Sequence, residues 1–475
     1  MTGVTKGRKE LSKVLAALEA ALGDAVATDE AILKAHCRDY WSRSELTDWL
    51  GDAQPLPLAV VTPRSTEAMA EAVRLCRAHG TVMVTRGGGS GVCGGVLADR
   101  DQVVLSTRGL DGLEHLDSHN LLATFGAGTM GMAAEEAVAA EGFTIGNWPQ
   151  SIALSTVGGW VATRASGQYS TAYGNTEDLV YDLEAVLPDG SIFRSRPTPR
   201  AAAGPDLRQL LLGSEGTLGV VTKVTFSLRP QAECGIRQAF HFADFATGIE
   251  AMREVIRPGW RPPVVRLYDA RESRRHFRDT CPQGRAMLIF LHEGPEAHAE
   301  AEAAAVADLC RARGGEAADK QTVDDWFAHR NTVPSWRELF EQGLVVDTIE
   351  VATDWRRLNA LYEATLAKFA AVPGLVAASA HSSHAYRSGA NLYFTFAVSP
   401  EREAMLGAYD ACWRGAMEAA AELGAGIAHH HGIGRVRRDW LTTELGAPGV
   451  ALLRTVKRAL DPDGLMNPGV LIPEG

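Results

Sequence analysis

Three consecutive histidines, His429, His430 and His431, precede the turn Gly432-Ile433-Gly434. An imidazole titrates near neutral pH, so this run could move protons, bind a metal ion or be an ordinary loop. Side chains on neighbouring residues cannot all point the same way, and we therefore expect at most one or two of the three to share a site. The glycine turn that follows could hold the run close to a cofactor.

A second group of reactive side chains lies in the segment HSSHAYRSGANLYFTF, residues 381–396. Its tail, Leu392 to Phe396, alternates like a strand of a sheet. This alternation places His384 and Tyr386 just before the strand. Tyr386 is then either a group that transfers protons or a hydrogen-bonded tyrosine at the edge of a sheet.

Three loops rich in glycine and hydroxyl side chains follow one another along the chain. They cover residues 85–91, 155–167 and 214–221, and each stands beside β-prone residues. Glycine lets backbone N–H groups approach a pyrophosphate closely, so the three loops together predict a pyrophosphate-binding site. Their layout is not that of a Rossmann or P-loop site.

Composition places the chain among ordinary globular proteins. It has 475 residues, of which 46% are hydrophobic and 22% charged, and a net charge of −11. The length allows two or more domains, and the negative charge argues against nucleic acid as a main partner. The seven cysteines are scattered without a CxxC pair, so we expect neither a disulfide framework nor a zinc ribbon. Residues 1–23 read as an amphipathic helix rather than a signal peptide, and no run reaches about 18 apolar residues, so we expect a cytoplasmic protein.

Four segments must position these groups: a helical segment at 1–50, an α/β region at 51–230, a cap region at 231–425, and a segment at 426–475 that returns to the α/β region. Within the α/β region, Ser65 and Thr66 are expected to cap a helix that ends at Gly80. A strand then runs into the first glycine loop. After Pro230, alternating runs separated by helical stretches predict an antiparallel sheet covered by helices.

The order of the three loops resembles the FAD domain of the FAD-linked oxidases, the vanillyl-alcohol-oxidase superfamily. The resemblance implies an α+β fold, in which an FAD domain of two α/β subdomains supports a cap domain with an antiparallel sheet and helices. It implies that backbone amides, more than lysines, hold the FAD pyrophosphate. The residues that the resemblance assigns to FAD are Thr85, Arg86, Gly87, Gly88, Gly89, Ser90, Gly91, Gln150, Ser151, Ser155, Thr156, Gly158, Thr163, Arg164, Ala165, Ser166, Glu215, Gly216, Thr217, Gly219, Val220 and Val221.

We expect this FAD to be bound without a covalent link. Some relatives tether the flavin through a histidine in or near the first loop, but neither this loop nor the residues after it contain a histidine before His115. Cys93 follows the loop, yet a cysteine link in this superfamily accompanies a second attachment. Cys93 is therefore expected to be a small buried residue.

Five segments together resemble the alkyldihydroxyacetonephosphate synthase family: SHAYRSGANLYFTF, HHHGIG, STVGGWVATRASG, YGNTEDLV and GSEGTLGVVTKVT. Only the tyrosine segment and the triple histidine are specific to this branch. In that family the flavin forms an adduct with acylated dihydroxyacetone phosphate, the fatty acid leaves, and a fatty alcohol replaces it without net redox change. The resemblance implies a small or lipid-like substrate, and it leaves peripheral membrane contact and a homodimer open.

The same resemblance assigns a role to each candidate residue. Tyr386 would carry out acid–base chemistry, and the histidine run would activate the incoming alcohol. Arg337 would bind the substrate phosphate, for which a bidentate guanidinium is suited, and Arg266 would lie near the flavin. Either arginine could instead form a surface or interdomain salt bridge. We expect Tyr386, the histidines and Arg337 to line one cavity, where positive groups help the phenol to give up its proton.

The alternative is an FAD-dependent D-2-hydroxy acid dehydrogenase or oxidase of the glycolate or D-lactate type, which the first loop, TRGGGSGVCGG, resembles more closely. Such enzymes typically hold a metal with an H…DGNxH and a GEHGIG segment. Here Tyr393 stands where a ligand histidine is expected, and His430 replaces the glutamate. Because a hard cation needs carboxylate oxygens, we expect no metal, although three histidines could hold zinc. A flavin-binding module without catalysis is a third hypothesis, which the combined tyrosine, arginine and histidine candidates disfavour.

Overall fold

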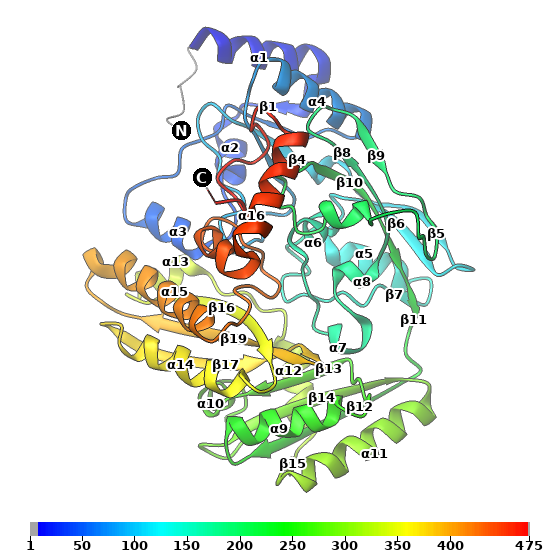
Figure 1. Cartoon of the computed structure of the whole chain (residues 1–475), viewed down its shortest axis with the longest axis vertical. Coiled ribbons are helices and arrows are strands. Elements are labelled where there is room, and N and C mark those ends of the chain that lie inside the picture. Colours follow the sequence, from blue (N-terminus) through cyan, green and yellow to red (C-terminus); the bar gives the residue numbers. More distant parts are fainter. Residues whose placement is uncertain (1–7, 474–475) are drawn as a thin grey trace.

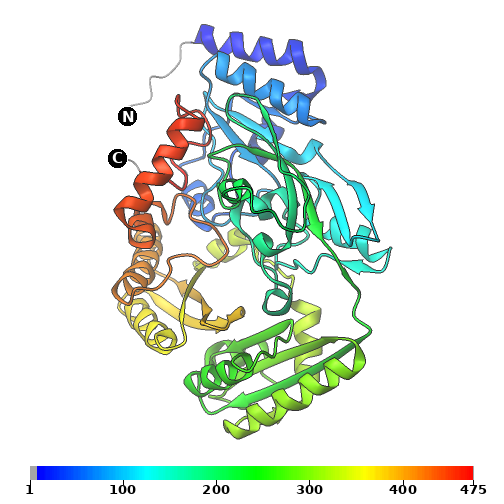
Figure 2. The ribbon, with the colours of Figure 1, turned by 45° about the vertical axis from the view of Figure 1, so that its right-hand side comes forward.

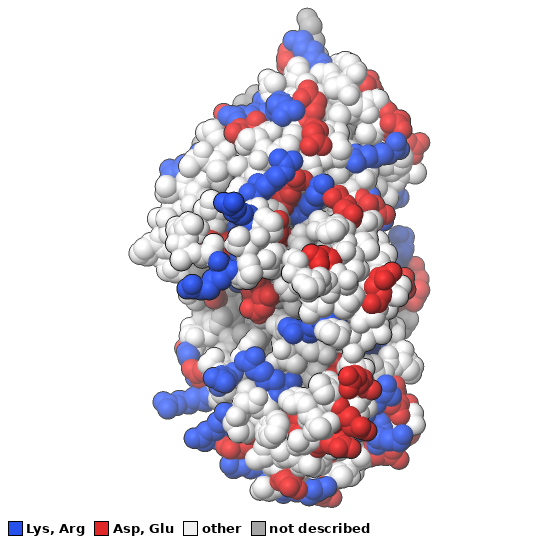
Figure 3. Space-filling model, turned by 90° about the vertical axis from the view of Figure 1, so that its right-hand side faces the viewer, with Lys and Arg blue, Asp and Glu red and all other residues white. Residues whose placement is uncertain are grey.

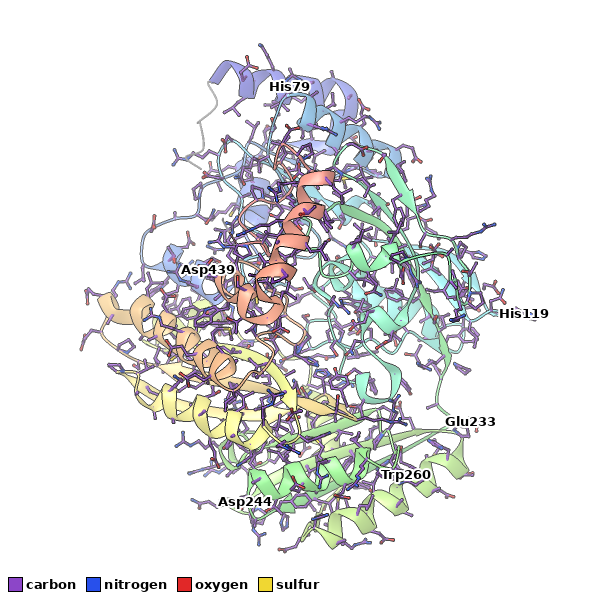
Figure 4. The ribbon with its side chains drawn as sticks, in the orientation of Figure 1. His79, His119, Glu233, Asp244, Trp260 and Asp439 are labelled. Carbon is purple, nitrogen blue, oxygen red and sulfur yellow. The ribbon has the colours of Figure 1, made fainter. Side chains whose placement is uncertain are left out.

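The structure is a computed structural model that describes residues 8–473. An upper part is built on two sheets, a lower part on one large sheet, and a C-terminal helix lies against the upper part (Figures 1 and 2). The chain passes from the upper to the lower part near Glu233, between β11 (Arg229–Pro230) and β12 (Cys234–Phe242) (Figure 4).

The N-terminal segment is helical only in part. Residues 1–7 of the expected first helix lie outside the described residues, and the helices that follow are α1 (Arg8–Leu22), α2 (Glu30–His36) and α3 (Ser42–Trp49). Gly23, at φ +52°, follows α1, and β1 (Val26–Ala27) then pairs with β2. Asp29 caps α2 by accepting the N–H of Ala31 at 2.9 Å. The uniformly helical segment expected from the sequence is therefore corrected, because a glycine and a capping aspartate divide it.

The first sheet carries the first glycine loop. Its strand order is β1-β2-β4-β3, and its parallel strands are β2 (Ala59–Val61), β3 (Met83–Arg86) and β4 (Val103–Ser106). Helix α4 (Thr66–Ala78) connects β2 to β3. Ser65 caps it by accepting the N–H of Ala68 at 3.1 Å, and Gly80 follows its end at φ +57°, as the sequence predicts. Strand β3 then leads directly into the glycine loop.

The second sheet is antiparallel, with the order β5-β6-β10-β8-β9. Its strands are β5 (Leu113–Asp117), β6 (Leu122–Gly126), β8 (Val180–Val186), β9 (Ile192–Arg194) and β10 (Val220–Ser227). The chain between β6 and β8 forms α5 (Gly131–Ala139), β7 (Phe143–Thr144), α6 (Val157–Thr163), α7 (Ser170–Tyr173) and α8 (Thr176–Leu179). The second glycine loop therefore surrounds α6, and the third precedes β10.

The lower part is one antiparallel sheet of eight strands, in the order β15-β12-β14-β13-β17-β19-β16, with β18 paired to β19. The strands that follow β12 are β13 (Val264–Tyr268), β14 (Ala286–Gly294), β15 (Glu316–Ala318), β16 (Val345–Asp354), β17 (Leu375–Ser382), β18 (Ala385–Tyr386) and β19 (Gly389–Val398). The strand predicted at 392–396 is thus the centre of β19, and Tyr386 lies just before it.

Both faces of this sheet are covered, by different elements. The helices on the outer face are α9 (Phe245–Ile256), α11 (Glu296–Ala312), α14 (Leu358–Ala370) and α15 (Met405–Glu422), whose apolar residues join one core with β13, β14 and β19. Asp244 and Trp260 lie near the two ends of α9 (Figure 4). The opposite face carries α10 (Ala270–His276) and α12 (Gln321–His329), and α13 (Trp336–Glu341) precedes β16.

Alternation along the strands sorts the side chains between these two faces. Val265 and Leu267 of β13 belong to the core beneath α9, whereas Val264 and Tyr268 belong to the cluster that includes Trp326 of α12. Arg266 shares the parity of Val264 and Tyr268 and so lies on the α12 side. Because the upper part contacts this side, polar residues there can reach the glycine loops.

The C-terminal segment returns to the upper part. Helix α16 (Leu441–Leu460) leads to Met466, which bridges to Met83 of β3, and Asn467 donates its N–H to Met83 O at 2.8 Å. Lys457 Nζ donates to Thr217 O in the third glycine loop at 2.7 Å. The end of the chain therefore lies beside the first and third glycine loops.

The α+β fold class predicted from the sequence is confirmed.

One visible face of the molecule mixes acidic and basic side chains without a broad area of one sign (Figure 3). Within residues 8–473, the helices are too short or too polar to span a membrane.

Candidate active site

The first and second glycine loops are in direct contact. A Cβ on Gly88 would lie 2.0 Å from Leu154 O, and one on Gly87 would lie 2.3 Å from Thr156 Oγ1. Only glycine fits at such close approaches of one backbone to another. Thr156 also caps α6 by accepting the N–H of Gly159 at 3.2 Å. The two loops that the sequence proposes for a pyrophosphate are thus brought together.

The third glycine loop packs against the first at a point where small residues meet. A Cβ on Gly216, which has φ +74°, would lie 3.0 Å from Thr85 Cβ. Glu215 points away from this contact, and its two carboxylate oxygens accept the N–H groups of Ile433 at 2.7 Å and Gly434 at 2.8 Å. Burial raises the Glu215 pKa to about 7. The Glu215 side chain therefore holds the turn after the histidine run, while its backbone N–H donates to Ala162 O at 2.9 Å and its carbonyl accepts from Asn467 Nδ2 at 2.7 Å.

The other residues assigned to FAD lie around this junction. Gln150 donates to Thr332 O at 2.6 Å, Arg164 pairs with Glu177 at 3.3 Å, and Ser166 donates to Asn175 Oδ1 at 2.6 Å. Ser151, Ser155, Gly158, Thr163 and Ala165 belong to α6 or its flanking turns, and Thr217, Gly219, Val220 and Val221 lead into β10. Ser90 and Gly91 continue the first loop beyond Gly89. The residues assigned to FAD thus extend over all three glycine loops, as an extended dinucleotide requires.

Unpaired polar atoms at this junction fit an FAD molecule. Among the described residues, Thr85 Oγ1, Arg86 Nε, Thr107 Oγ1 and Asn467 Oδ1 are buried without a hydrogen-bond partner. Buried polar groups normally have partners, so these atoms suit a ligand with many polar groups. Leu154 beside them is 43% exposed although it is a large apolar residue. The site thus combines polar and apolar contacts, as a flavin with its pyrophosphate requires.

The residues that could tether a flavin are poorly placed for it. Burial raises the Cys93 pKa well above its usual value, and Arg437 donates to its sulfur at 3.2 Å. A buried neutral thiol is unreactive. His79, which precedes the loop in sequence, is the C-terminal cap of α4 and lies near α1 (Figure 4). His79 and the loop are at opposite ends of β3, so non-covalent binding remains our prediction.

Tyr386 and His429 meet at the end of β18. Tyr386 Oη lies 2.6 Å from His429 Nε2 and also donates to Asn175 Oδ1 at 3.2 Å. Burial raises the Tyr386 pKa above its usual value and lowers the His429 pKa to about 4. The expectation that a positive imidazole helps the phenol is therefore corrected, because burial leaves both groups neutral at pH 7. They form a neutral hydrogen-bonded pair.

A single carboxylate orders the histidine run. Glu350 Oε1, on β16, accepts the N–H groups of His429, His430 and His431 at 3.2, 3.1 and 2.8 Å. Its Oε2 lies 3.1 Å from His431 Nδ1 and forms a buried ion pair with Arg437. Burial alone would raise the Glu350 pKa, but Arg437 and the histidines hold it well below its usual value. The run is therefore fixed as a turn around one anion.

The three imidazoles point in different directions, as expected of neighbouring residues. His429 faces Tyr386, His431 faces Glu350, and His430 Nδ1 lies 2.9 Å from His429 Nδ1. His384 stacks on His429 and shares a hydrogen bond of 2.5 Å with Ser170. The ligand nitrogens of His384, His429 and His430 lie within 4.8 Å of one another. This distance would allow a transition metal, and the absence of a metal stays a prediction.

The two candidate arginines differ in position. Arg266 donates to Tyr268 Oη at 2.8 Å and lies 3.0 Å from His381 Nε2, so it belongs to the same polar face as the histidines. Arg337 lies on α13 with a side chain that is 64% exposed, and it pairs with Glu341 at 3.7 Å. Its neighbours Trp336 and Phe340 take the buried side of this helix. The structure therefore brings Arg266, but not Arg337, toward Tyr386.

Sequence reasoning did not single out Glu350, Arg437 or Arg330. Glu350 carries a weak signal, since it and Asp347 are the two carboxylates inside the otherwise mostly apolar run VVDTIEVA. Arg437 follows the glycine turn but reaches Glu350 only through the fold. Arg330 lies directly after α12 and donates to Tyr169 Oη at 2.8 Å. All three act through partners distant in sequence.

Comparison with known proteins agrees with this geometry. Residues 57–196 match the FAD binding domain family, and residues 237–471 match the C-terminal domain of FAD linked oxidases. The uncharacterized FAD-linked oxidoreductase YgcU of Escherichia coli K12 is 34% identical over 469 residues, covering 95% of this chain and 96% of that protein. Alkyldihydroxyacetonephosphate synthase of Caenorhabditis elegans is 30% identical over 468 residues, covering 89% of this chain and 77% of the relative.

A solved structure of alkyldihydroxyacetonephosphate synthase has the same fold. It superposes with a TM-score of 0.80 at 23% identity, over 98% of this chain and 86% of that one. The predicted resemblance, fold and FAD cofactor are thereby confirmed. The chain belongs to the FAD-linked oxidases and uses FAD as its cofactor.

Proposed function

We propose that this enzyme exchanges the acyl group of acyl-dihydroxyacetone phosphate for a fatty alcohol. The observation that carries the proposal is the 2.6 Å contact between Tyr386 Oη and His429 Nε2, which joins the two segments specific to the synthase branch. In the exchange, a carbon–oxygen bond to the departing carboxylate breaks and one to the alcohol oxygen forms. The alcohol proton is released, and no electrons are transferred overall.

Bound FAD supplies a ring that can take up and return electrons, and the residues beside it supply proton transfer. Two arrangements of hydrogens satisfy the contacts around Tyr386. In one, Tyr386 donates to His429 and His429 donates to His430; in the other, His430 donates to His429, His429 donates to Tyr386, and Tyr386 donates to Asn175. Switching from the first to the second passes one proton from Tyr386 to His429 and one from His429 to His430, while Tyr386 takes up a proton and His430 Nε2 releases one, so that no buried charge is left. The row therefore suits the removal and return of a substrate proton.

The same site supports a second candidate, the oxidation of a D-2-hydroxy acid. Two observations favour it: the first glycine loop resembles that of the glycolate and D-lactate enzymes, and Arg337, the expected phosphate ligand, lies on the surface. Such an oxidation also needs a group that takes the hydroxyl proton, and the Tyr386–His429 pair could take it.

Parallel anaerobic reactions separate the two candidates. The FAD-loaded protein is mixed with palmitoyl-dihydroxyacetone phosphate and hexadecanol, and separately with D-lactate and with glycolate. We expect hexadecyl-dihydroxyacetone phosphate and palmitate in equal amounts by mass spectrometry, and an unchanged flavin spectrum with both hydroxy acids. Bleaching of the flavin by either hydroxy acid, without an ether product in the first reaction, would overturn the proposal in favour of the oxidation.

A further inference from the structure

Two arginines lie close to the ring of Trp326 on the polar face of the large sheet. The guanidinium carbons of Arg266 and Arg330 lie 5.4 and 5.6 Å from the centre of that ring. Arg266 comes from β13 and Arg330 from the residue after α12, so two separate elements each bring a cation to this ring. Arg330 also lies over the rings of Trp148 and Tyr169, at 4.8 and 5.3 Å.

Neither of these cations has a carboxylate partner among residues 8–473, whereas their neighbours do. Arg237 pairs with Asp324 of α12, and Arg275 pairs with Glu272 at 2.9 Å. Two partly buried guanidinium groups without a counter-charge are costly, unless an anion joins them. The aromatic rings offset only part of this cost, because a cation–π contact is weaker than an ion pair with a buried carboxylate.

The acidic side chains closest to this pair are already engaged. Glu272 lies 2.7 Å from His381 Nδ1, and Glu293 accepts the hydroxyl of Tyr173 at 2.8 Å. A further donor is free, because Trp148 Nε1 is buried without a partner. A fixed N–H group and two guanidinium groups together form a set of donors with no acceptor of matching charge.

This donor set is connected to the proposed proton-transfer row. Arg330 donates to Tyr169 Oη at 2.8 Å, and the next residue, Ser170, shares a hydrogen bond of 2.5 Å with His384. His384 stacks on His429, with ring centres 4.7 Å apart. On the other side, Arg266 contacts His381, three residues before His384. The two arginines are therefore linked to Tyr386 through side chains of the same polar face.

We infer that Arg266, Arg330 and Trp148 Nε1 bind the anionic group of the substrate, in place of the role first considered for Arg337. The inference rests on the active site of the proposed function and extends it. The chemistry that this set recognises is a phosphate monoester or a carboxylate, because both accept paired hydrogen bonds from a guanidinium. A phosphate would come from acyl-dihydroxyacetone phosphate, and a carboxylate from a 2-hydroxy acid.

Binding of unreactive anions tests this inference without turnover. The FAD-loaded protein is titrated by calorimetry with sn-glycerol 3-phosphate and, separately, with oxalate, and glycerol serves as the uncharged control. We expect one of the two anions to bind and glycerol not to bind. Arg330→Gln and Arg266→Gln should each weaken that anion about tenfold or more, because a hydrogen bond to a charged group is lost. Arg330→Lys should retain part of the affinity.

Arg337→Gln is the matched control, since it removes an equal charge from the exposed side of α13 and should change the affinity less than twofold. The flavin spectrum and the melting temperature without anion are recorded for each variant, so that loss of the fold is not mistaken for loss of binding. Should Arg330→Gln fail to fold, Arg266→Gln and Arg330→Lys carry the test. Wild-type affinity in the Arg330 and Arg266 variants, loss in Arg337→Gln, or no binding of either anion to the wild type would overturn the inference. Binding of glycerol 3-phosphate without an exchange reaction would contradict only the proposed function and leave this inference standing.

Discussion

Two buried carboxylates hold the segment 429–434 from opposite sides, and they do so in different electrostatic surroundings. Glu350 of the large sheet accepts the three N–H groups of the histidine run, and Glu215 of the FAD-binding part accepts the two N–H groups that follow. Glu350 has Arg437 as a buried partner, whereas Glu215 has no ion pair among the described residues. Their pKa values accordingly shift in opposite directions.

The difference shows what a contacting arginine contributes together with the neighbouring histidines. Burial raises the pKa of any carboxyl group, and backbone N–H groups lower it only in part. With Arg437 in contact, Glu350 stays ionised and can order the histidines that reach Tyr386. Without such a contact, Glu215 titrates near neutral pH. The histidine run is thus fixed by a permanent anion on the cap side and by a pH-sensitive group on the FAD side.

Removal of Arg437 should have the largest effect on this arrangement. Arg437→Met leaves the Glu350 carboxylate buried without its cation, and we expect the free energy of unfolding to fall by about 3–5 kcal/mol. Urea unfolding of the FAD-loaded protein measures the change. The double variant Arg437→Met with Glu350→Gln should recover part of the loss, because it leaves no unpaired charge.

The control is Arg311→Met, which breaks an exposed pair with Asp308 on α11 and should cost far less. If the double variant were as unstable as Arg437→Met, packing rather than charge would explain the effect, and the contrast between the two carboxylates would fail.

The second test concerns the pH dependence of Glu215. Its pKa is raised from 4.5 to about 7, so the folded state binds the proton more tightly than the unfolded state. This contribution to stability is complete below pH 4.5 and is lost as the pH rises through about 7. It amounts to at most about 3 kcal/mol, at 1.36 kcal/mol per pKa unit. The stability of the wild type relative to Glu215→Gln should therefore decrease between pH 4.5 and 8.

The contribution of Glu350 to stability should depend on pH in the opposite direction, which the variant Glu350→Gln tests. The Glu350 pKa is lowered in the folded state, so its contribution is present above pH 4.5 and is lost as the pH falls. The two Gln variants should therefore give pH profiles of opposite slope relative to the wild type. Parallel profiles would show that the two carboxylates share one electrostatic environment.

Much of the fold follows from local sequence signals. The cap at Ser65, the end of α4 before Gly80 and the alternation of β19 each depend on residues within one element, and the structure agrees with all three. The same holds for the three glycine loops, whose order indicated the cofactor. The segment expected to be helical at 1–50 contains three helices and a short strand within its described part, because a single glycine and one capping aspartate interrupt it.

The site was predictable only where chemistry and spacing coincide. Tyr386 and His429 were singled out, and they are in contact. Their charge state was not foreseen, since burial of both groups depends on the packed sheet. Arg337 lies on the exposed face of its helix, because Trp336 and Phe340 take the buried face. Glu350 lies 79 residues before His429 in sequence, and no local pattern reveals that its carboxylate meets the backbone of the run.

A third test concerns the contact between Tyr386 and His429, whose backbone N–H is held by Glu350. Tyr386→Phe removes the hydroxyl that meets His429 Nε2, and we expect the rate of the flavin spectral change with substrate to fall about 100-fold or more, as for loss of a general acid–base group. The FAD content should stay unchanged. Stopped-flow absorbance measures the rate.

Tyr393→Phe is the matched control, because its hydroxyl bonds to Thr348 at 3.0 Å on the same face. It should leave the rate within a fewfold of the wild type. A wild-type rate in Tyr386→Phe would make Tyr386 a structural residue and remove the main support for the proposed exchange.

The smallest effect is expected from removal of metals. The imidazole groups of this site have hydrogen-bonding partners: His429 with Tyr386, His384 with Ser170, and His430 with His429. A metal at His384, His429 and His430 would have to displace a contact of His429, either the one between its Nε2 and Tyr386 or the 2.9 Å contact between its Nδ1 and His430 Nδ1. We therefore expect less than a twofold change in activity after dialysis against dipicolinate, and less than 0.1 equivalents of zinc, cobalt or nickel by mass spectrometry of the purified protein. The contrary outcome is a purified protein that contains stoichiometric metal, loses its activity when this metal is removed and regains it when zinc is added. The site would then be a metal centre and not a hydrogen-bonded row. In that case Glu350 would act by orienting metal ligands instead of proton-transfer groups.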